Sequence, residues 1–246
     1  MLAAGQVPDD GSGDVRVLHW NIHSWRDESG APSTGAVTEL ISRTSPHAVS
    51  LVEVDETWNA SMLLSQVAAS CGYTWVFCPS FEYGTGKSAG AFGNALLARI
   101  PVTAVQYWRL FTPAQPYDRT EPTEPRSAVL ARLAFSGASL WVGSTHLPRG
   151  NHDDRRAAAR KLQQMIPQLD EPWLICGDFN APAESCFPDN PGIRVSSPRQ
   201  PTYPASRPAE SIDYCIGSPG IAAQTAVLQA GGSDHLPVLV VAQLRS

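Results

Sequence analysis

The sequence predicts an α/β protein, a four-layer α/β/β/α sandwich in which two packed mixed β-sheets are flanked by helices. Three observations support this prediction. Segments with strand character outnumber helical ones, the helical segments fall between groups of strands, and no repeat or linker divides the chain. A chain of 246 residues is long enough to bury one large core. We therefore expect one domain over residues 15–246, preceded by a disordered or frayed tail at residues 1–14.

Short apolar runs in the N-terminal half predict strands, because they are rich in β-branched residues and end at polar or turn-forming residues. These strands are expected at residues 15–21, 48–53, 73–78 and 94–99. Helical spacing of apolar residues predicts a short helix at 37–45, which Pro46 stops, and a second helix at 58–71. Gly and small polar residues predict a loop at 82–93.

The C-terminal half repeats this organisation around one strong helix. An acidic first turn, an Arg/Ala-rich body and Pro167 predict that helix at residues 153–166. Strands are expected at residues 127–135, 139–145, 173–176, 211–216 and 236–244. Frequent prolines predict irregular loops at 111–125 and 182–208, the second of which we expect to form one wall of a cleft.

Composition excludes some classes of protein. With 43% hydrophobic and 17% charged residues and no long apolar run, the chain is neither disordered nor expected to insert stably in a membrane. A net charge of −5 disfavours a broad nucleic-acid-wrapping face, but not a nuclease with a local cationic site. Residues 1–14 lack the basic and apolar regions of a signal peptide, so we expect a cytoplasmic location. A secreted form without its leader stays open, and the oligomeric state is not predicted.

The five cysteines are scattered and contain no Cys-x-x-Cys pair. Such a pattern predicts reduced, mostly buried thiols. A disulfide between Cys71 and Cys78 in a secreted form is the alternative.

Polar, metal-competent side chains recur at the carboxyl ends of the predicted strands. They are Asn21, Glu53, His146, Asp178 with Asn180, and Asp213 in the last strand pair. One such residue is more often a turn former than a functional group. Five strand ends that carry such residues indicate a shared site, because strand ends of a packed sheet meet at one rim.

Two runs carry the most information. In 177–182, Gly177 permits a close backbone approach, while Asp178 and Asn180 offer a carboxylate and an amide from one turn. In 231–238, two glycines precede Asp234 and His235, which combine a potential cation ligand with a side chain that exchanges protons near neutrality. An Asx-turn and a capping turn are the structural alternatives.

Six runs in the same order resemble motifs of the endonuclease/exonuclease/phosphatase superfamily, which includes DNase I-like nucleases, neutral sphingomyelinases and inositol-polyphosphate phosphatases. The runs are Val17-Leu-His-Trp-Asn21-Ile, Leu51-Val-Glu53-Val, Ser144-Thr-His146-Leu, Gly177-Asp-Phe-Asn180, Ser211-Ile-Asp213-Tyr and Ser233-Asp-His235-Leu-Pro. The resemblance extends from about residue 15 to the C-terminus. It implies a DNase I-like four-layer sandwich.

The resemblance also implies a divalent metal, Mg²⁺ or alternatively Mn²⁺, at the site. Glu53 is then the principal ligand, with Asn21 and Asp234 close to the metal. Oxygen ligands of this kind favour Mg²⁺ or Mn²⁺ over zinc.

Catalytic roles follow from the same resemblance. His235 is expected to be a general acid/base oriented by Asp213, and Asp178 to orient the attacking water. His146 is expected to be a second catalytic or phosphate-contacting histidine, and Asn180 to be a catalytic residue that hydrogen-bonds the phosphate. Asp178 and His235 both remain candidates for the general base.

Arg126 occupies the position of a phosphate-contacting arginine in DNase I-like members. A surface charge beside a strand is nearly as good an interpretation of this residue.

The function implied is Mg²⁺-dependent phosphodiester hydrolysis by in-line attack of water, with nucleic acid slightly favoured as the substrate. A phosphatase or sphingomyelinase-like phospholipase acting on a small or lipid phosphoester is the alternative. A catalytically inactive binding module is a third hypothesis. The chain departs from the family at Val52, where Gln is usual, and at His146, where abasic-site endonucleases keep a tyrosine.

Overall fold

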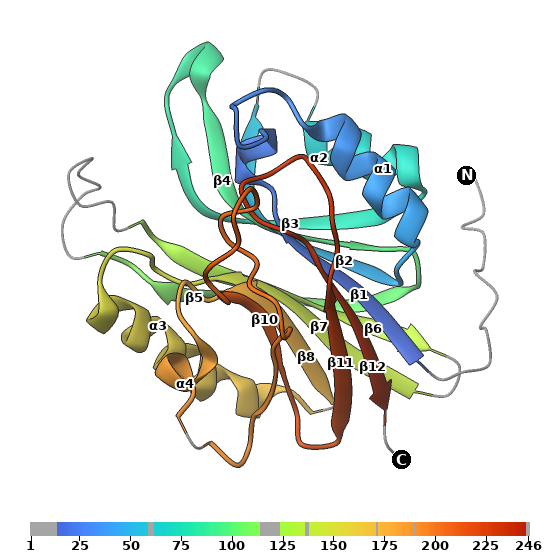
Figure 1. Ribbon diagram of the computed structural model, residues 1–246, viewed down its shortest axis with the longest axis vertical. Helices are drawn as coiled ribbons and strands as arrows, with labels where there is room; N and C mark the ends of the chain where they lie inside the picture. The colour runs from blue at the N-terminus through green and yellow to red at the C-terminus, as the bar shows by residue number, and fades with distance from the viewer. Residues whose placement is uncertain are drawn as a thin grey trace.

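Two six-stranded sheets pack face to face in the computed structural model, which describes residues 14–58, 62–113, 124–135, 138–170, 172–188 and 190–244. Helices α1 (Thr34–Thr44) and α2 (Leu63–Cys71) cover the outer face of one sheet. Helices α3 (His152–Met165) and α4 (Ala183–Cys186) cover the other sheet (Figure 1). The predicted four-layer α/β/β/α sandwich is therefore confirmed.

The first sheet has the strand order β11-β12-β1-β2-β4-β3. Its strands in chain order are β1 (Asp14–Asn21), β2 (Ala48–Thr57), β3 (Thr74–Tyr83), β4 (Gly90–Ala98), β11 (Ile221–Val227) and β12 (Val238–Leu244). Only β1 and β2 run parallel in the described part of this sheet, so the sheet is mixed.

The second sheet has the order β5-β6-β7-β8-β10-β9. Its strands are β5 (Val102–Phe111), β6 (Arg126–Phe135), β7 (Ala138–His146), β8 (Trp173–Asp178), β9 (Arg194–Ser196) and β10 (Asp213–Gly217). Here β7 and β8 form the parallel pair, and the other described neighbours are antiparallel.

Three apolar clusters hold the layers together. The central cluster fills the space between the sheets and includes Val17, Val129, Val142 and Val240. A second cluster packs α3 against the second sheet, and a third packs α1 and α2 against the first sheet. Inner strands are buried on both faces, which explains why their sequences are nearly continuous apolar runs rather than alternating ones.

The helix ends follow from local sequence. Asn151 caps α3 by accepting a hydrogen bond from the Asp153 backbone N–H at 2.8 Å, and the acidic residues in the first turn complement the helix dipole. Helix α2 ends at Gly72, whose φ of 76° lies in the left-handed region that glycine adopts most easily. Three 3₁₀ turns complete the elements of the described residues: His23–Trp25, Gly86–Ser88 and Ile166–Gln168.

Several predicted boundaries are wrong. The loop expected at 82–93 is shorter than predicted and spans residues 84–89, because β3 continues to Tyr83 and β4 begins at Gly90. Helix α2 begins at Leu63 rather than at residue 58, and strands β5, β9 and β11 were not predicted. Asp14 belongs to β1. Residues 1–13 of the expected tail, residues 114–123 of the expected loop, and residues 136 and 137 between two predicted strands lie outside the described residues.

The prediction of reduced thiols is wrong for one pair of cysteines. Cys176 of β8 and Cys215 of β10 occupy directly opposite positions in the antiparallel ladder, and a disulfide joins them. Cys71, Cys78 and Cys186 are free, so the alternative Cys71–Cys78 bond is not formed. The sequence did not reveal this pair because it did not indicate that β8 and β10 are neighbours.

No helix within the described ranges combines the length and the apolar character that crossing a bilayer requires.

Candidate active site

The candidate site lies where the two sheets meet at one end of their parallel pairs. His146 and Asp178 end β7 and β8 and lie side by side in the parallel register. Asp213 begins β10 and is the antiparallel partner of Asp178. Asn21 ends β1 of the other sheet, and His235 precedes β12. The topology therefore delivers five polar side chains to one rim.

Asn21 connects the two sheets through its amide group. Its Nδ2 donates to Glu53 Oε1 at 3.0 Å and to Asp178 Oδ2 at 3.1 Å. Its Oδ1 accepts from the His23 backbone N–H at 3.0 Å. The amide thus holds a carboxylate of the first sheet beside a carboxylate of the second.

Glu53 was expected at the end of a strand, but it lies in a β-bulge within β2. The register between β2 and β4 shifts between Leu51 and Val54, and Glu53 has a φ of 57°. A non-glycine residue in the left-handed region is uncommon, and bulges often re-aim a side chain beside a functional site. Here the bulge brings the half-buried Glu53 carboxylate to Asn21 while β2 continues to Thr57.

His235 and Asp213 form a buried hydrogen-bonded pair. His235 Nδ1 donates to Asp213 Oδ2 at 2.8 Å, and Thr202 Oγ1 donates to the same oxygen at 2.6 Å. The other ring nitrogen, Nε2, lies 3.7 Å from Asp178 Oδ2. The Trp20 indole N–H fixes the backbone of His235 by donating to its carbonyl at 2.8 Å.

Burial and mutual electrostatic interactions determine the pKa values of Asp213, His235 and Asp178. Burial alone would raise the pKa of Asp213, but the charge of His235, the hydrogen bond from His235 and the nearby His19 ring hold it well below its usual value. Burial also opposes the charge on His235, yet Asp213 raises the pKa of His235 to about 10. Asp178 has a pKa raised to about 7, first by burial and then by the charge of Asp213. At neutral pH the pair is therefore an imidazolium and a carboxylate, while Asp178 is ready to exchange a proton.

His146 is held as a neutral ring. Arg126 Nη1 donates to its Nδ1 at 3.2 Å, while Asn180 Nδ2 lies 2.8 Å from its Nε2. Asp178 Oδ2 lies 3.5 Å from the same Nε2. Burial, followed by the charge of Arg126, lowers the pKa of His146 well below its usual value.

Asn180 is positioned by the turn that follows β8. Its backbone N–H donates to Asp178 Oδ1 at 2.9 Å, which is the Asx-turn weighed as the structural alternative. Its side chain also donates to the Leu147 carbonyl at 2.9 Å and approaches His146. The turn therefore coexists with contacts to the site. The close approach expected at Gly177 is also present, because a Cβ at this position would lie 2.5 Å from the Thr145 carbonyl oxygen.

Arg126 begins β6 and is buried, so the alternative of a surface charge does not describe it. It forms an ion pair with Glu124 at 3.1 Å in addition to its contact with His146. Burial raises the pKa of Glu124, Arg126 opposes that shift, and the charge of Glu53 adds to it. Glu124 is a further carboxylate within electrostatic reach of Glu53.

Asp234 is the predicted site residue whose position is least connected to the others. Its Oδ1 lies 3.8 Å from His23 Nδ1 and accepts from Ser233 Oγ at 3.2 Å. The Ser233 hydroxyl also reaches the Asn21 carbonyl at 2.6 Å. The proximity of Asp234 to a metal stays a prediction.

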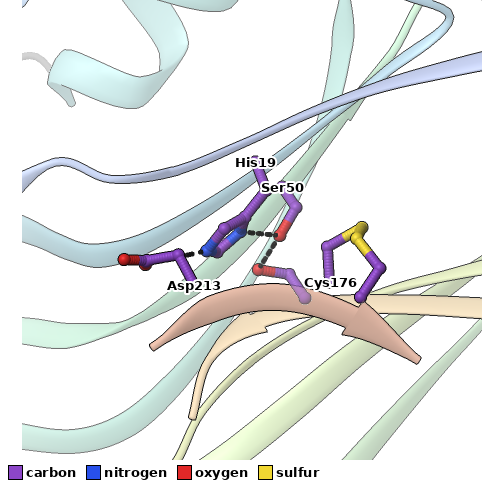
Figure 2. The surroundings of a disulfide bond; sticks show 6 residues. His19, Ser50, Cys176 and Asp213 are labelled. Carbon is purple, nitrogen blue, oxygen red and sulfur yellow. Dashed lines mark hydrogen bonds and ion pairs between the residues drawn. A yellow bond between two sulfur atoms is a disulfide. The ribbon is translucent and has the colours of Figure 1, made fainter. Parts of the chain in front are cut away.

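His19 extends the site into the space between the sheets (Figure 2). Its Nε2 lies 3.4 Å from Asp213 Oδ1, and its Nδ1 lies 2.9 Å from Ser50 Oγ. Ser50 donates to Ser144 Oγ at 2.9 Å, and Ser144 donates to the Leu51 carbonyl. The disulfide at Cys176 lies beside this chain of hydrogen bonds. His19 lies within the strand predicted at residues 15–21, and it is fully buried.

Sequence reasoning missed two neighbours of His235, namely Thr202 and Tyr203. The ring centroids of Tyr203 and His235 are 4.5 Å apart. Both missed residues lie in the Pro-rich segment that was expected only to shape a cleft wall. A threonine and a tyrosine inside a loop carry no pattern that would indicate their contacts.

A model of the endonuclease/exonuclease/phosphatase family matches residues 18–235. Three solved structures show the same fold. An endonuclease/exonuclease/phosphatase protein from Beutenbergia cavernae is 21% identical with a TM-score of 0.73, covering 95% of this chain and 72% of that one. One from Bacteroides vulgatus is 18% identical with a TM-score of 0.74, covering 94% and 99%. A mannosyl-6-phosphatase from Bacteroides thetaiotaomicron is also 18% identical with a TM-score of 0.74, covering 93% and 99%.

None of the curated protein sequences matches this chain. The fold and the family model nevertheless define the class, which is a phosphoesterase-type hydrolase. This chain belongs to the endonuclease/exonuclease/phosphatase family.

Proposed function

We propose that this protein hydrolyses phosphodiester bonds with the help of Mg²⁺, for which Mn²⁺ can substitute, and that nucleic acid is its favoured substrate. The observation that carries the proposal is the hydrogen-bonded connection from Glu53 through Asn21 to Asp178, with His235 Nε2 3.7 Å from Asp178. Groups from both sheets are thereby held next to one another. The histidine at position 146, where abasic-site endonucleases keep a tyrosine, disfavours abasic DNA.

The residues present fit a hard divalent cation near Glu53. Its carboxylate is half-buried, and among the described residues only Asn21 hydrogen-bonds to it. The pKa values of Asp178 and Glu124 are both raised, chiefly by burial, and nearby carboxylate charges add to each shift. A cation relieves such crowding of negative charge, and oxygen donors suit Mg²⁺ or Mn²⁺. Bound there, it would polarise the phosphate and neutralise charge on its oxygens.

A second grouping offers ligand atoms from Asp178, Asp213 and His235, all within 4.8 Å of one another. We assign this grouping to proton transfer instead. Both Thr202 and His235 already donate to Asp213 Oδ2, and His19 lies against Oδ1. These contacts leave Asp213 as the partner that orients an imidazolium.

The protonation states divide the chemical roles that the sequence left open. Asp178, with a pKa of about 7, is ionised often enough to accept a proton from the attacking water. The pKa of His235 is raised to about 10, chiefly by Asp213 against the effect of burial, which favours the protonated ring and supports a role as donor rather than as base. His235 Nε2 and Asp178 Oδ2 are only 3.7 Å apart. Both groups can therefore contact the substrate phosphate from the same side. His235 then stabilises charge on the phosphate oxygens.

His146, Asn180 and Arg126 complete the phosphate site. The neutral His146 ring and the Asn180 amide lie next to Asp178, where they contact phosphate oxygens without adding net charge. The buried Arg126 guanidinium supplies positive charge behind His146. Donors fixed in advance stabilise a transition state more effectively than solvent does.

The test compares plasmid DNA, single-stranded RNA, sphingomyelin and bis(p-nitrophenyl) phosphate, each with Mg²⁺ and with chelator. We expect metal-dependent cleavage of the nucleic acids and of the small diester. His235→Ala should lower kcat by about 10²–10³-fold, as is typical when one donor that stabilises transition-state charge is removed. Glu53→Gln should raise the Mg²⁺ concentration for half-maximal activity by about tenfold or more. The exposed His152→Ala variant is the control. Undiminished turnover in chelator would overturn the proposal.

A phosphatase acting on a phosphomonoester is the second candidate, because one structural neighbour is a mannosyl-6-phosphatase. Mannose 6-phosphate and p-nitrophenyl phosphate belong in the same assay. Faster turnover of these monoesters than of the diester and the nucleic acids would favour this candidate. Absence of turnover with every substrate would favour an inactive binding module.

A further inference from the structure

An exposed arginine is held at the rim of the site by an aromatic ring. Arg149 follows β7 by three residues, and its Nη2 donates to the Tyr203 hydroxyl at 3.1 Å. The guanidinium carbon lies 5.5 Å from the centroid of the Tyr203 ring. The same ring lies 4.5 Å from the ring of His235. Arg149 is therefore one side chain away from the proposed phosphate site.

The loop that carries Tyr203 is pinned on both sides. Tyr203 exchanges backbone hydrogen bonds with Glu210, at 3.2 Å and 2.8 Å. The Ala205 N–H donates to the Asp234 carbonyl at 2.6 Å, which ties the loop to the segment before β12. Tyr203 is thus a fixed support for the guanidinium.

The charge of Arg149 is not neutralised within the described part of the chain. It is exposed, and no carboxylate in these residues forms an ion pair with it. Burial is the largest single influence on the pKa of Arg149 and lowers it, but the Tyr203 hydroxyl and the charges of Asp178 and Glu53 together raise it above its usual value. The cation therefore lies within electrostatic reach of these two carboxylates and has donors left for a ligand.

We propose that Arg149, supported by Tyr203, binds a second phosphate of the substrate, adjacent to the phosphate that is cleaved. The inference rests on the proposed function, because it takes the cleaved phosphate to lie among His146, Asn180 and His235. A guanidinium suits this task, since its planar fork matches two phosphate oxygens.

The subsite distinguishes classes of substrate. A nucleic-acid strand always presents a neighbouring phosphate, whereas a sugar monophosphate or a simple diester has none. Arg149 therefore selects for polyphosphodiesters or for small molecules with a second phosphate.

Binding without turnover tests the subsite directly. Thymidine 3′,5′-bisphosphate and thymidine 5′-monophosphate are titrated calorimetrically into the full chain in chelator, where metal-dependent cleavage is blocked. We expect the wild-type protein to bind the bisphosphate more tightly. Arg149→Gln should reduce the ratio of the two affinities by about tenfold, the equivalent of about 1.4 kcal/mol for a charge-assisted contact. Tyr203→Phe, which removes the supporting hydroxyl, should reduce it less.

Arg149→Lys and Arg43→Gln serve as matched controls. The lysine variant keeps the charge without the fork and should retain part of the selectivity. Arg43 is an exposed arginine in the last turn of α1, so its substitution should leave the ratio unchanged. An equal affinity of the wild-type protein for both nucleotides, or an unchanged ratio in Arg149→Gln, would overturn the subsite.

A turnover assay distinguishes a failure of the proposed Arg149 subsite from a failure of the proposed function. Thymidine 5′-(p-nitrophenyl phosphate) and its 3′-phosphorylated form are compared with Mg²⁺ present. Loss of the preference for the second substrate in Arg149→Gln supports the subsite. If neither substrate is cleaved but the binding ratio still depends on Arg149, the proposed function fails while the subsite stands. A short oligonucleotide as a third substrate tells a nucleic-acid strand from a small bisphosphate.

Discussion

The Asp213 carboxylate receives side chains from three distant parts of the chain. His235 and Thr202 donate to one oxygen, and His19 lies 3.4 Å from the other. All four residues are buried, so water cannot replace a lost partner. At the scale of single residues, this carboxylate determines how His235 is oriented and charged.

The pH dependence of activity follows from this arrangement. With its pKa raised to about 7, Asp178 loses its proton as pH rises through that value, so kcat/KM should increase there. With its pKa raised to about 10, His235 loses its charge above that value, so kcat/KM should then decrease. Steady-state rates on a small diester between pH 5 and pH 11 measure both limbs. In Asp213→Asn the alkaline limb should move to lower pH, whereas a single limb near pH 4 would contradict the assignment.

His19 should contribute to stability through the same carboxylate. His19→Ala leaves Asp213 Oδ1 and Ser50 Oγ without their buried neighbour, at a cost of about 1–3 kcal/mol in the free energy of unfolding. Urea denaturation followed by circular dichroism measures this cost. His152→Ala on the surface should change it by less than about 0.5 kcal/mol. Equal stability of the two variants would show that the His19 contacts carry no weight.

Strands β8 and β10 bring Asp178 and Asp213 together, and the disulfide joins these strands two residues from each carboxylate. At the scale of elements, the disulfide should keep β8 and β10 in register and so hold the two carboxylates next to each other. In denaturant without reductant, three of the five thiols should react with a thiol reagent, and after reduction all five. Loss of the bond in Cys176→Ala should cost about 2–4 kcal/mol of stability. Five reactive thiols before reduction would exclude the bond.

The close contact of β7 and β8 depends on Gly177. Gly177→Ala places a methyl group against the Thr145 carbonyl oxygen, so the strands must move apart next to Asp178. We expect a loss of about 1–3 kcal/mol of stability, as is typical of overpacking, together with reduced kcat. Gly35→Ala in α1 is the control, since its Cβ would meet no atom within 4 Å. Thermal melting should therefore separate the two variants, and identical melting temperatures would refute the packing argument.

At the scale of the whole molecule, the sequence predicted buried strands better than edge strands. Strands β5, β9 and β11 lie at sheet edges and have few buried positions, so their apolar pattern is weak. Inner strands such as β1 and β8 are buried on both faces and were found from their apolar runs.

The residues of the candidate site were likewise predicted best where they lie at the ends of inner, buried strands. Asn21, His146 and Asp178 stand at the ends of inner strands, which made them visible in the sequence. The bulge at Glu53 and the contacts of Tyr203 depend on pairing between distant segments. A single sequence does not specify such pairing.

The central claim is that Glu53 and His235 act on one phosphate although they come from opposite ends of the chain. A double-mutant cycle on kcat with Glu53→Gln, His235→Ala and the combined variant tests it most directly. Groups that act as a unit have strongly non-additive effects, so the combined variant should be about as slow as the slower single variant. A combined loss equal to the product of the two single losses would show that they act independently and would contradict the account.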